Sequence, residues 1–204
     1  MCLALVAVTA LAQTPSNLVV ENIPAFPDAL VEKVHPYLES RTASFQSWNP
    51  ARAEMLITTR FGNTPQLHLV KMPGGARQQL TFFSDRVLGG GFRPNDPNTI
   101  LFTRDIGGGE FFQLYRFDLR SGDVTLLTDG KSRNTSSRSS RDGKWLAYAS
   151  TRRNGKDTDL YIVDPMQLAT TTRMVLQVEG GGWSVADISP DDKQLLVHNT
   201  ISAN

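Results

Sequence analysis

Apolar and polar residues alternate along several short runs of the chain. The clearest runs cover residues 66–72 (QLHLVKM), 113–119 (QLYRFDL) and 159–164 (DLYIVD). A period of two is typical of a β-strand with one buried face, because successive strand side chains point to opposite faces. The 3.6-residue period of an amphipathic helix is absent from residue 45 onward. The pattern therefore predicts an all-β fold for residues 45–204.

These strands recur within a longer repeat. Four segments align: SWNPARAEMLITTR (47–60), GFRPNDPNTILFTR (91–104), SSRDGKWLAYAS (139–150) and ISPDDKQLLVHN (188–199). Each contains a turn anchored on Pro50, Pro94, Arg141 or Pro190, and these anchors lie 44, 47 and 49 residues apart. A β-rich repeat of about 40–50 residues is typical of β-propeller blades. We expect the leucines that follow the anchors to occupy equivalent buried positions: Leu56, Leu101, Leu146 and Leu195 or Leu196.

Each complete repeat has room for one blade of four antiparallel strands. The anchor is followed by a β-rich run, a polar loop, the alternating strand and an outer strand, which is predicted at 77–83, 123–128 and 173–178. The expected blades cover about 45–88, 89–134 and 135–182, and the repeat at 183–204 holds about two strands. Propellers close with about four to eight blades. We therefore expect an incomplete β-propeller of about three and a half blades, the N-terminal piece of a longer protein.

The first 12 residues have the features of a signal peptide. Residues 3–11 (LALVAVTAL) form an uncharged apolar run, and Ala10-Leu11-Ala12 is a cleavage site of the small-x-small type. No Lys or Arg precedes the run, which leaves open whether the true start lies upstream; a buried core strand or helix is the alternative reading. Cleavage is predicted after Ala12, and the protein is expected to be secreted or periplasmic.

Residues 13–44 are predicted to form a linker that contains one short helix. Residues 23–27 (IPAFP) are rich in proline. Asp28 is a candidate cap for a helix over 29–34, and Pro36 is expected to stop or kink it. No apolar run in the chain approaches the ~18 residues that a membrane span requires, so no membrane-spanning helix is expected.

Composition and charge exclude several classes of function. Lys and Arg number 21 against 20 Asp and Glu, and a net charge of +1 argues against a nucleic-acid partner. The single cysteine, Cys2, excludes a disulfide framework and a cysteine-based zinc site. The glycine triplets at 89–91, 107–109 and 180–182 lack the lysine and the helix of a phosphate-binding loop, so we expect turns and narrow inner strands there. No metal and no cofactor is expected.

Several longer phrases resemble a known family. They are YLESR (37–41), TRFG (59–62), QQLTFF (78–83), GGGEFFQLY (107–115), LTDGKSRN (127–134) and STRRNGKDTD (150–159). From about Tyr37 to the C-terminus, the chain resembles the β-propeller of secreted bacterial serine peptidases of the prolyl oligopeptidase (S9) family. Shorter phrases such as SRDGKWLAY are generic and also resemble TolB-like and WD40-like propeller repeats.

The resemblance implies a propeller that caps an α/β-hydrolase domain. In that family the hydrolase domain carries the nucleophilic serine in a Gly-x-Ser-x-Gly turn, followed by Asp and His. This sequence contains no such turn, and its three histidines, His35, His68 and His198, stand in no setting that suits a triad. No catalytic residue is therefore assigned to this chain. The implied enzyme is a longer serine peptidase, in which the missing hydrolase domain and peptide substrates are the partners. The alternative is a periplasmic TolB-like propeller that binds partner proteins without an attached enzyme.

Four charged residues are candidates for holding a substrate. Residues 131–144 are expected to form a basic loop in which Arg133 and Arg138 attract the carboxylate of a peptide, with an ordinary solvated loop as the alternative. Arg104 and Glu110 belong to a second polar cluster. In exopeptidases related to the family, acidic propeller residues hold the free amine of the substrate, and the resemblance suggests this part for Glu110. A loop ion pair is the alternative.

Overall fold

The computed structural model describes residues 19–24 and 27–202. The predicted signal peptide and its cleavage site lie outside the described residues. The chain forms two units, Met1–Ser40 and Arg41–Asn204, and every strand of the described residues belongs to the second unit.

The first unit contains helix α1 (Asp28–Leu38), which is longer than the sequence predicts. Pro27 occupies the capping position, and Asp28 lies in the first turn, where a negative charge interacts favourably with the helix dipole. Pro36 lies inside the helix and does not end it. A proline this close to the C-terminal end removes one backbone donor, and the helix stops two residues later.

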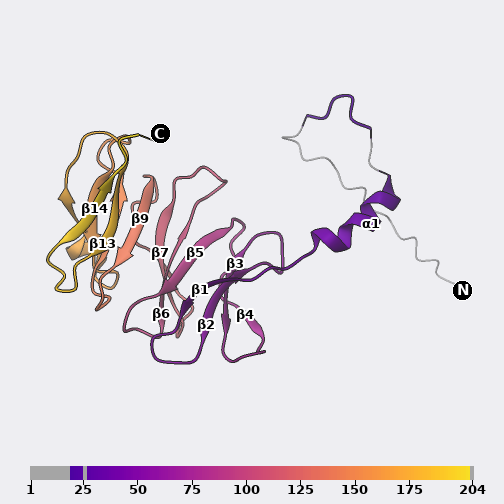
Figure 1. Cartoon of the computed structure of the whole chain (residues 1–204), viewed down its shortest axis with the longest axis horizontal. Coiled ribbons are helices and arrows are strands. Elements are labelled where there is room, and N and C mark those ends of the chain that lie inside the picture. The colour runs from indigo at the N-terminus through magenta and orange to yellow at the C-terminus, as the bar shows by residue number, and fades with distance from the viewer. Residues whose placement is uncertain (1–18, 25–26, 203–204) are drawn as a thin grey trace, which may run out of the picture. The chain divides into compact units, whose positions relative to one another are not determined.

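The second unit consists of antiparallel sheets whose strands follow one another in chain order, and we call these sheets blades 1 to 4 (Figure 1). Blade 1 contains β1 (Ser44–Trp48), β2 (Met55–Thr59), β3 (Gln66–Val70) and β4 (Arg77–Gln79). Blade 2 contains β5 (Val87–Phe92), β6 (Thr99–Arg104), β7 (Gln113–Asp118) and β8 (Val124–Leu126). Blade 3 contains β9 (Asn134–Ser139), β10 (Leu146–Ser150), β11 (Asp159–Val163) and β12 (Arg173–Leu176), with the single-turn helix α2 (Leu168–Thr171) between the last two. Blade 4 contains β13 (Trp183–Ile188) and β14 (Leu195–Asn199). The predicted all-β fold of four-stranded antiparallel sheets is confirmed, and the fourth sheet has two strands.

The blades pack against one another through apolar clusters. One cluster joins Leu56 and Leu67 of blade 1 to Ile100 and Phe117 of blade 2. Further clusters join blade 2 to blade 3 and blade 3 to blade 4. Blade 3 therefore has a neighbouring blade on both faces, and its middle strands β10 and β11 are buried at every position, as is β3 of blade 1. The edge strand β12, in contrast, is exposed at every position.

The four leucines that follow the anchors form two sets rather than one. Leu146 and Leu195 pair with the final residues of β9 and β13, whereas Leu56 and Leu101 lie one residue further along their own strands. Adjacent strand side chains point to opposite faces, so the two sets face different neighbours. Burial of Leu56 and Leu146 is confirmed. Leu101 and Leu195 are half-buried and Leu196 is exposed, which corrects the predicted equivalence.

We call the first strand of each blade its inner strand. The inner strands of blades 2 and 3, β5 and β9, have unusual sequences. The basic loop expected over 131–144 contains β9, whose sequence NTSSRS has no apolar residue and therefore shows no apolar alternation. The glycine triplet 89–91 lies in β5. A Cβ added to Gly90 would come within 2.8 Å of both the Leu101 carbonyl oxygen and the Phe102 Cβ. Glycine is thus required where this strand approaches β6.

Candidate functional site

A cleft of about 610 Å³ opens where loops of blades 2, 3 and 4 meet. We call it the Glu110 cleft. Three charged side chains line it, Glu110, Arg133 and Lys156, together with the aromatic residues Phe111 and Trp183. The remaining lining consists of glycine, threonine and serine. The cleft therefore combines charges of both signs with aromatic surface, which suits a ligand that carries both polar ends and apolar groups.

The loop between β6 and β7 presents Glu110 to the cleft. At its base, the buried Asp105 carboxylate accepts a hydrogen bond from the Glu110 backbone N–H at 3.1 Å. Glu110 itself has a φ of +60°, in the left-handed region that non-glycine residues seldom occupy. Such a conformation persists where the surroundings enforce it, and the Asp105 hydrogen bond is one such restraint.

Glu110 and Arg133 face each other in the cleft. Arg133 Nη2 lies 3.7 Å from Glu110 Oε2, and the two side chains are 51% and 68% exposed. An ion pair with this exposure contributes little to stability, because water screens both charges. Both groups thus remain accessible, so that the carboxylate can meet an amine and the guanidinium a carboxylate of a bound molecule.

The loop between β10 and β11, which contributes Lys156 to the cleft, is held by a network around Arg153. The Arg153 guanidinium donates to the buried Asp159 carboxylate at 2.7 Å and to Asp157 at 2.9 Å, and it also donates to the Val178 carbonyl. The hydrogen bond from Arg153 lowers the pKa of Asp159 below its usual value. The pKa of Asp157 is lowered first by a hydrogen bond from the Asn154 side chain. This network fixes the loop that carries Lys156.

Two of the four predicted binding residues lie elsewhere. The Arg104 guanidinium stacks over the Phe83 ring at 4.1 Å and lies 5.4 Å from the Tyr115 ring. Arg138 Nε donates to the Ala186 carbonyl at 3.0 Å and so connects β9 to β13. The structure therefore brings Glu110 and Arg133 together and keeps Arg104 and Arg138 in other contacts. For all four, a role in substrate binding stays a prediction.

Lys156 and Trp183 line the cleft without having been predicted as binding residues from the sequence. Each directly follows a glycine, Gly155 or Gly182, in a turn that lines the Glu110 cleft. Glycine followed by a cationic or aromatic residue between two strand patterns is the sequence signal that points to these positions. The signal is weak, because most such turns are solvent-exposed without a ligand.

Among the residues that the structure describes, no group of three or more His, Cys, Asp and Glu side chains is placed to hold a metal ion. In the same residues, no helix has the length and apolar character needed to cross a membrane.

Consecutive four-stranded antiparallel blades define the chain as a β-propeller protein, and solved structures support this class. The crystal structure of TolB from Acinetobacter baumannii matches with a TM-score of 0.59 and 20% identity over 80% of this chain and 39% of that chain. A structure from a study of two prolyl endopeptidases matches with a TM-score of 0.62 and 17% identity over 83% of this chain and 28% of that one. Putative TolB from Agrobacterium tumefaciens matches with a TM-score of 0.57 and 16% identity over 80% and 61%.

These likenesses establish the fold. The predicted resemblance to propellers of the S9 peptidase and TolB types is confirmed at that level. This chain spans less than two thirds of the length of each of the three structures. No protein-family model matches the sequence, and no curated protein matches it.

Proposed function

We propose that this chain is the non-catalytic, substrate-gating propeller of a serine peptidase of the prolyl oligopeptidase (S9) family. The observation that carries the proposal is the pairing of Glu110 with Arg133 inside one cleft. A short peptide with free ends carries an ammonium group and a carboxylate, and the cleft offers one group of the opposite sign to each. The likeness to a prolyl endopeptidase structure supports the same assignment.

In this proposal the catalytic groups belong to an α/β-hydrolase domain of the same polypeptide. Acyl transfer by a Ser-His-Asp triad takes place there, and the propeller admits short peptides and holds their ends. The protein is exported through its signal peptide to the periplasm or the medium.

Calorimetric titration of the chain with Ala-Pro-Ala tests the proposed binding. The peptide with free ends is expected to bind, and the same peptide acetylated and amidated is expected not to. Glu110→Gln should remove the preference for a free amine, and Arg133→Gln the preference for a free carboxylate. The matched controls are Glu179→Gln and Arg120→Gln, whose side chains are exposed and outside the cleft. Equal binding of the free and blocked peptides would contradict the proposal.

A second candidate function is a TolB-like propeller that binds partner proteins and has no enzyme attached. It is favoured by the match to Acinetobacter baumannii TolB, which has the highest sequence identity of the three structures, 20%. Sequencing of the gene beyond the codon for Asn204 discriminates the two. A Gly-x-Ser-x-Gly turn in the same reading frame, with labelling of the whole protein by a fluorophosphonate probe, selects the peptidase.

A further inference from the structure

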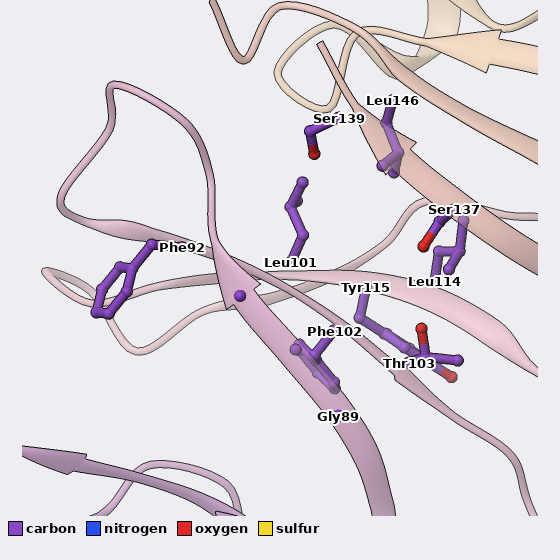
Figure 2. Close-up of a pocket in the computed structure, with 12 residues that line it drawn as sticks. Gly89, Phe92, Leu101, Phe102, Thr103, Leu114, Tyr115, Ser137, Ser139 and Leu146 are labelled. Carbon is purple, nitrogen blue, oxygen red and sulfur yellow. The ribbon is translucent and has the colours of Figure 1, made fainter. Parts of the chain in front are cut away.

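A second cavity, of about 270 Å³, lies between blades 2 and 3 (Figure 2). Its walls include the glycine-rich strand β5 on one side and Ser137 and Ser139 of β9 on the other. Leu114 and Leu146 at its base are buried, whereas both serines are half-exposed. We call it the serine cavity. It has a polar mouth at the inner strands and an apolar base.

The cavity exists because this interface between blades is built differently from its neighbours. Between blades 1 and 2, the Gly90 N–H donates to Gln46 Oε1 at 3.3 Å and the Phe92 N–H to Ser47 Oγ at 3.0 Å. Between blades 3 and 4, a side chain of β9 donates to a backbone carbonyl of β13.

No hydrogen bond joins β5 to β9 among the described residues. Blades 2 and 3 are connected elsewhere. Arg93 Nε donates to the Gly143 carbonyl at 2.7 Å at the anchor turns, and Asn134 Nδ2 at the start of β9 donates to the Phe112 carbonyl at 2.8 Å. The inner strands of these two blades therefore leave a space that no protein group fills, and the serine cavity lies in it.

The aliphatic hydroxyls of three residues line the cavity, beside the phenol of Tyr115. Ser137 and Ser139 are two residues apart on β9 and face the same side, and Thr103 lies on β6. Figure 2 shows the Ser139 hydroxyl directed towards Leu101 of blade 2. Within the described part of the chain, none of the three hydroxyls has a hydrogen-bond partner, although each can donate one hydrogen bond and accept two. They are thus available to a bound molecule.

The lining also defines what the molecule must be. No charged side chain lines the cavity, and a charge taken out of water without a partner of opposite sign is strongly disfavoured. An occupant must therefore be uncharged. Leu101, Leu114 and Leu146 favour an apolar face on the occupant, because contact with them removes apolar surface from water.

We propose that the serine cavity binds a small uncharged polyhydroxylated ring, with its hydroxyl groups towards Thr103, Ser137 and Ser139 and its C–H face on the leucines. A volume of about 270 Å³ lies just below the range of roughly 300–1,000 Å³ for sites of drug-sized ligands, which fits a single sugar ring. The site is separate from the Glu110 cleft and does not depend on the peptidase assignment.

Saturation-transfer NMR on the chain tests the proposal with methyl β-D-glucopyranoside as the probe. Transfer to the glucoside is expected. Sodium D-glucuronate, which has the same ring with a carboxylate, is expected to show none. The double variant Ser137→Ala/Ser139→Ala should weaken binding about tenfold, as expected for the loss of one or two hydrogen bonds. The control is Ser84→Ala/Ser121→Ala, whose side chains are exposed.

Two further measurements exclude a purely structural role for the serines. Leu101→Phe, which fills the cavity from the blade 2 side, should also abolish transfer. Without the glucoside, the double serine variant should melt at the wild-type temperature, because the two hydroxyls that it lacks have no protein partner in the wild type. The proposal is overturned if the glucoside shows no transfer, which means that the cavity holds water alone. It is also overturned if glucuronate binds equally or if the double variant melts earlier.

Discussion

At the scale of single residues, a buried polar side chain begins the third strand of each complete blade. These residues are Gln66, Gln113 and Asp159, which are 3%, 3% and 0% exposed. The two glutamines donate to and accept from backbone groups of the segment that leads to the next blade. A carboxylate can accept but not donate, and in blade 3 Arg153 supplies the missing donors. The three residues therefore hold the start of the third strand against the segment that connects each blade to the next.

We predict that Gln113→Ala destabilises the fold by about 2–4 kcal/mol, because its hydrogen bonds are buried and their partners would be left unsatisfied. Gln113 Oε1 accepts from the Thr128 hydroxyl at 2.7 Å and from the Gly130 N–H at 3.0 Å, and Nε2 donates to two carbonyls. Urea unfolding measures the change. The control is Gln78→Ala, at an exposed position of β4. A loss no larger than that of the control would show that water replaces the amide.

The stability contributed by Asp159 is predicted to depend on pH. The hydrogen bond from Arg153 lowers the pKa of Asp159 below the usual 3.8. A carboxyl group with a lowered pKa contributes stability that is present above the usual value and is lost as the pH falls through the lowered one. Asp159→Asn should therefore cost about 1–3 kcal/mol at neutral pH, as for hydrogen bonds to a charged group, and this difference should shrink at acidic pH.

Urea unfolding of the wild type and of Asp159→Asn at pH 7 and at several values below 4 measures this dependence. The exposed Asp123→Asn serves as the control for a change of net charge. A difference between Asp159→Asn and the wild type that stays constant from neutral to acidic pH would contradict the role given to the Arg153 hydrogen bond.

At the scale of elements, the alternating strands β3, β7 and β11 were predictable because each shows a period of two in apolar residues. The strand β9 was not, because its hydroxyl-rich sequence carries no apolar signal and its place is set by pairing with β10. The register of the second strands was predictable only to within one residue. The anchor turns are equal in length, but the leucine is the first residue of β10 and β14 and the second residue of β2. A shift of one residue moves a side chain to the other face.

The two sets of leucines give a prediction at the same scale. Leu146 is 3% exposed and lies in the cluster between blades 2 and 3. Leu146→Ala should destabilise the fold by roughly 2–5 kcal/mol. Leu101→Ala should cost less, because Leu101 is only half-buried and its removal exposes less apolar contact to water. Thermal unfolding of both variants compares them, and equal losses would contradict the register described above.

At the scale of the whole molecule, a sequence pattern cannot predict a site that residues of several blades form together. Glu110 and Arg133 belong to different loops, and only the packing of blade 2 against blade 3 brings them within 3.7 Å. Arg104 and Arg138 carry the same charge as Arg133 in the sequence, yet one stacks on aromatic rings and the other connects two strands. The type of side chain was predictable here, and its neighbours were not.

Blade 4 differs from the other blades in having two strands instead of four among the described residues. The second strands β2, β6 and β10 each pair with a strand on both edges, whereas β14 pairs with β13 alone among the described residues. The free edge of β14 presents unpaired backbone groups, and Leu196 on this strand is 65% exposed. An exposed apolar edge strand is a template for pairing with another chain.

We predict that the chain self-associates through β14 and that Leu196→Lys shifts it towards the monomer, because a charge on an edge strand opposes pairing. Ile201→Lys is the matched control: Ile201 is 92% exposed, but it lies outside the strand, so its replacement removes the same kind of apolar surface without charging the edge. Sedimentation velocity over a range of protein concentrations gives the answer. A wild-type chain that sediments as a monomer at every concentration would show that the edge of β14 is protected, and an equal effect of the two lysine variants would assign the association to general apolar exposure.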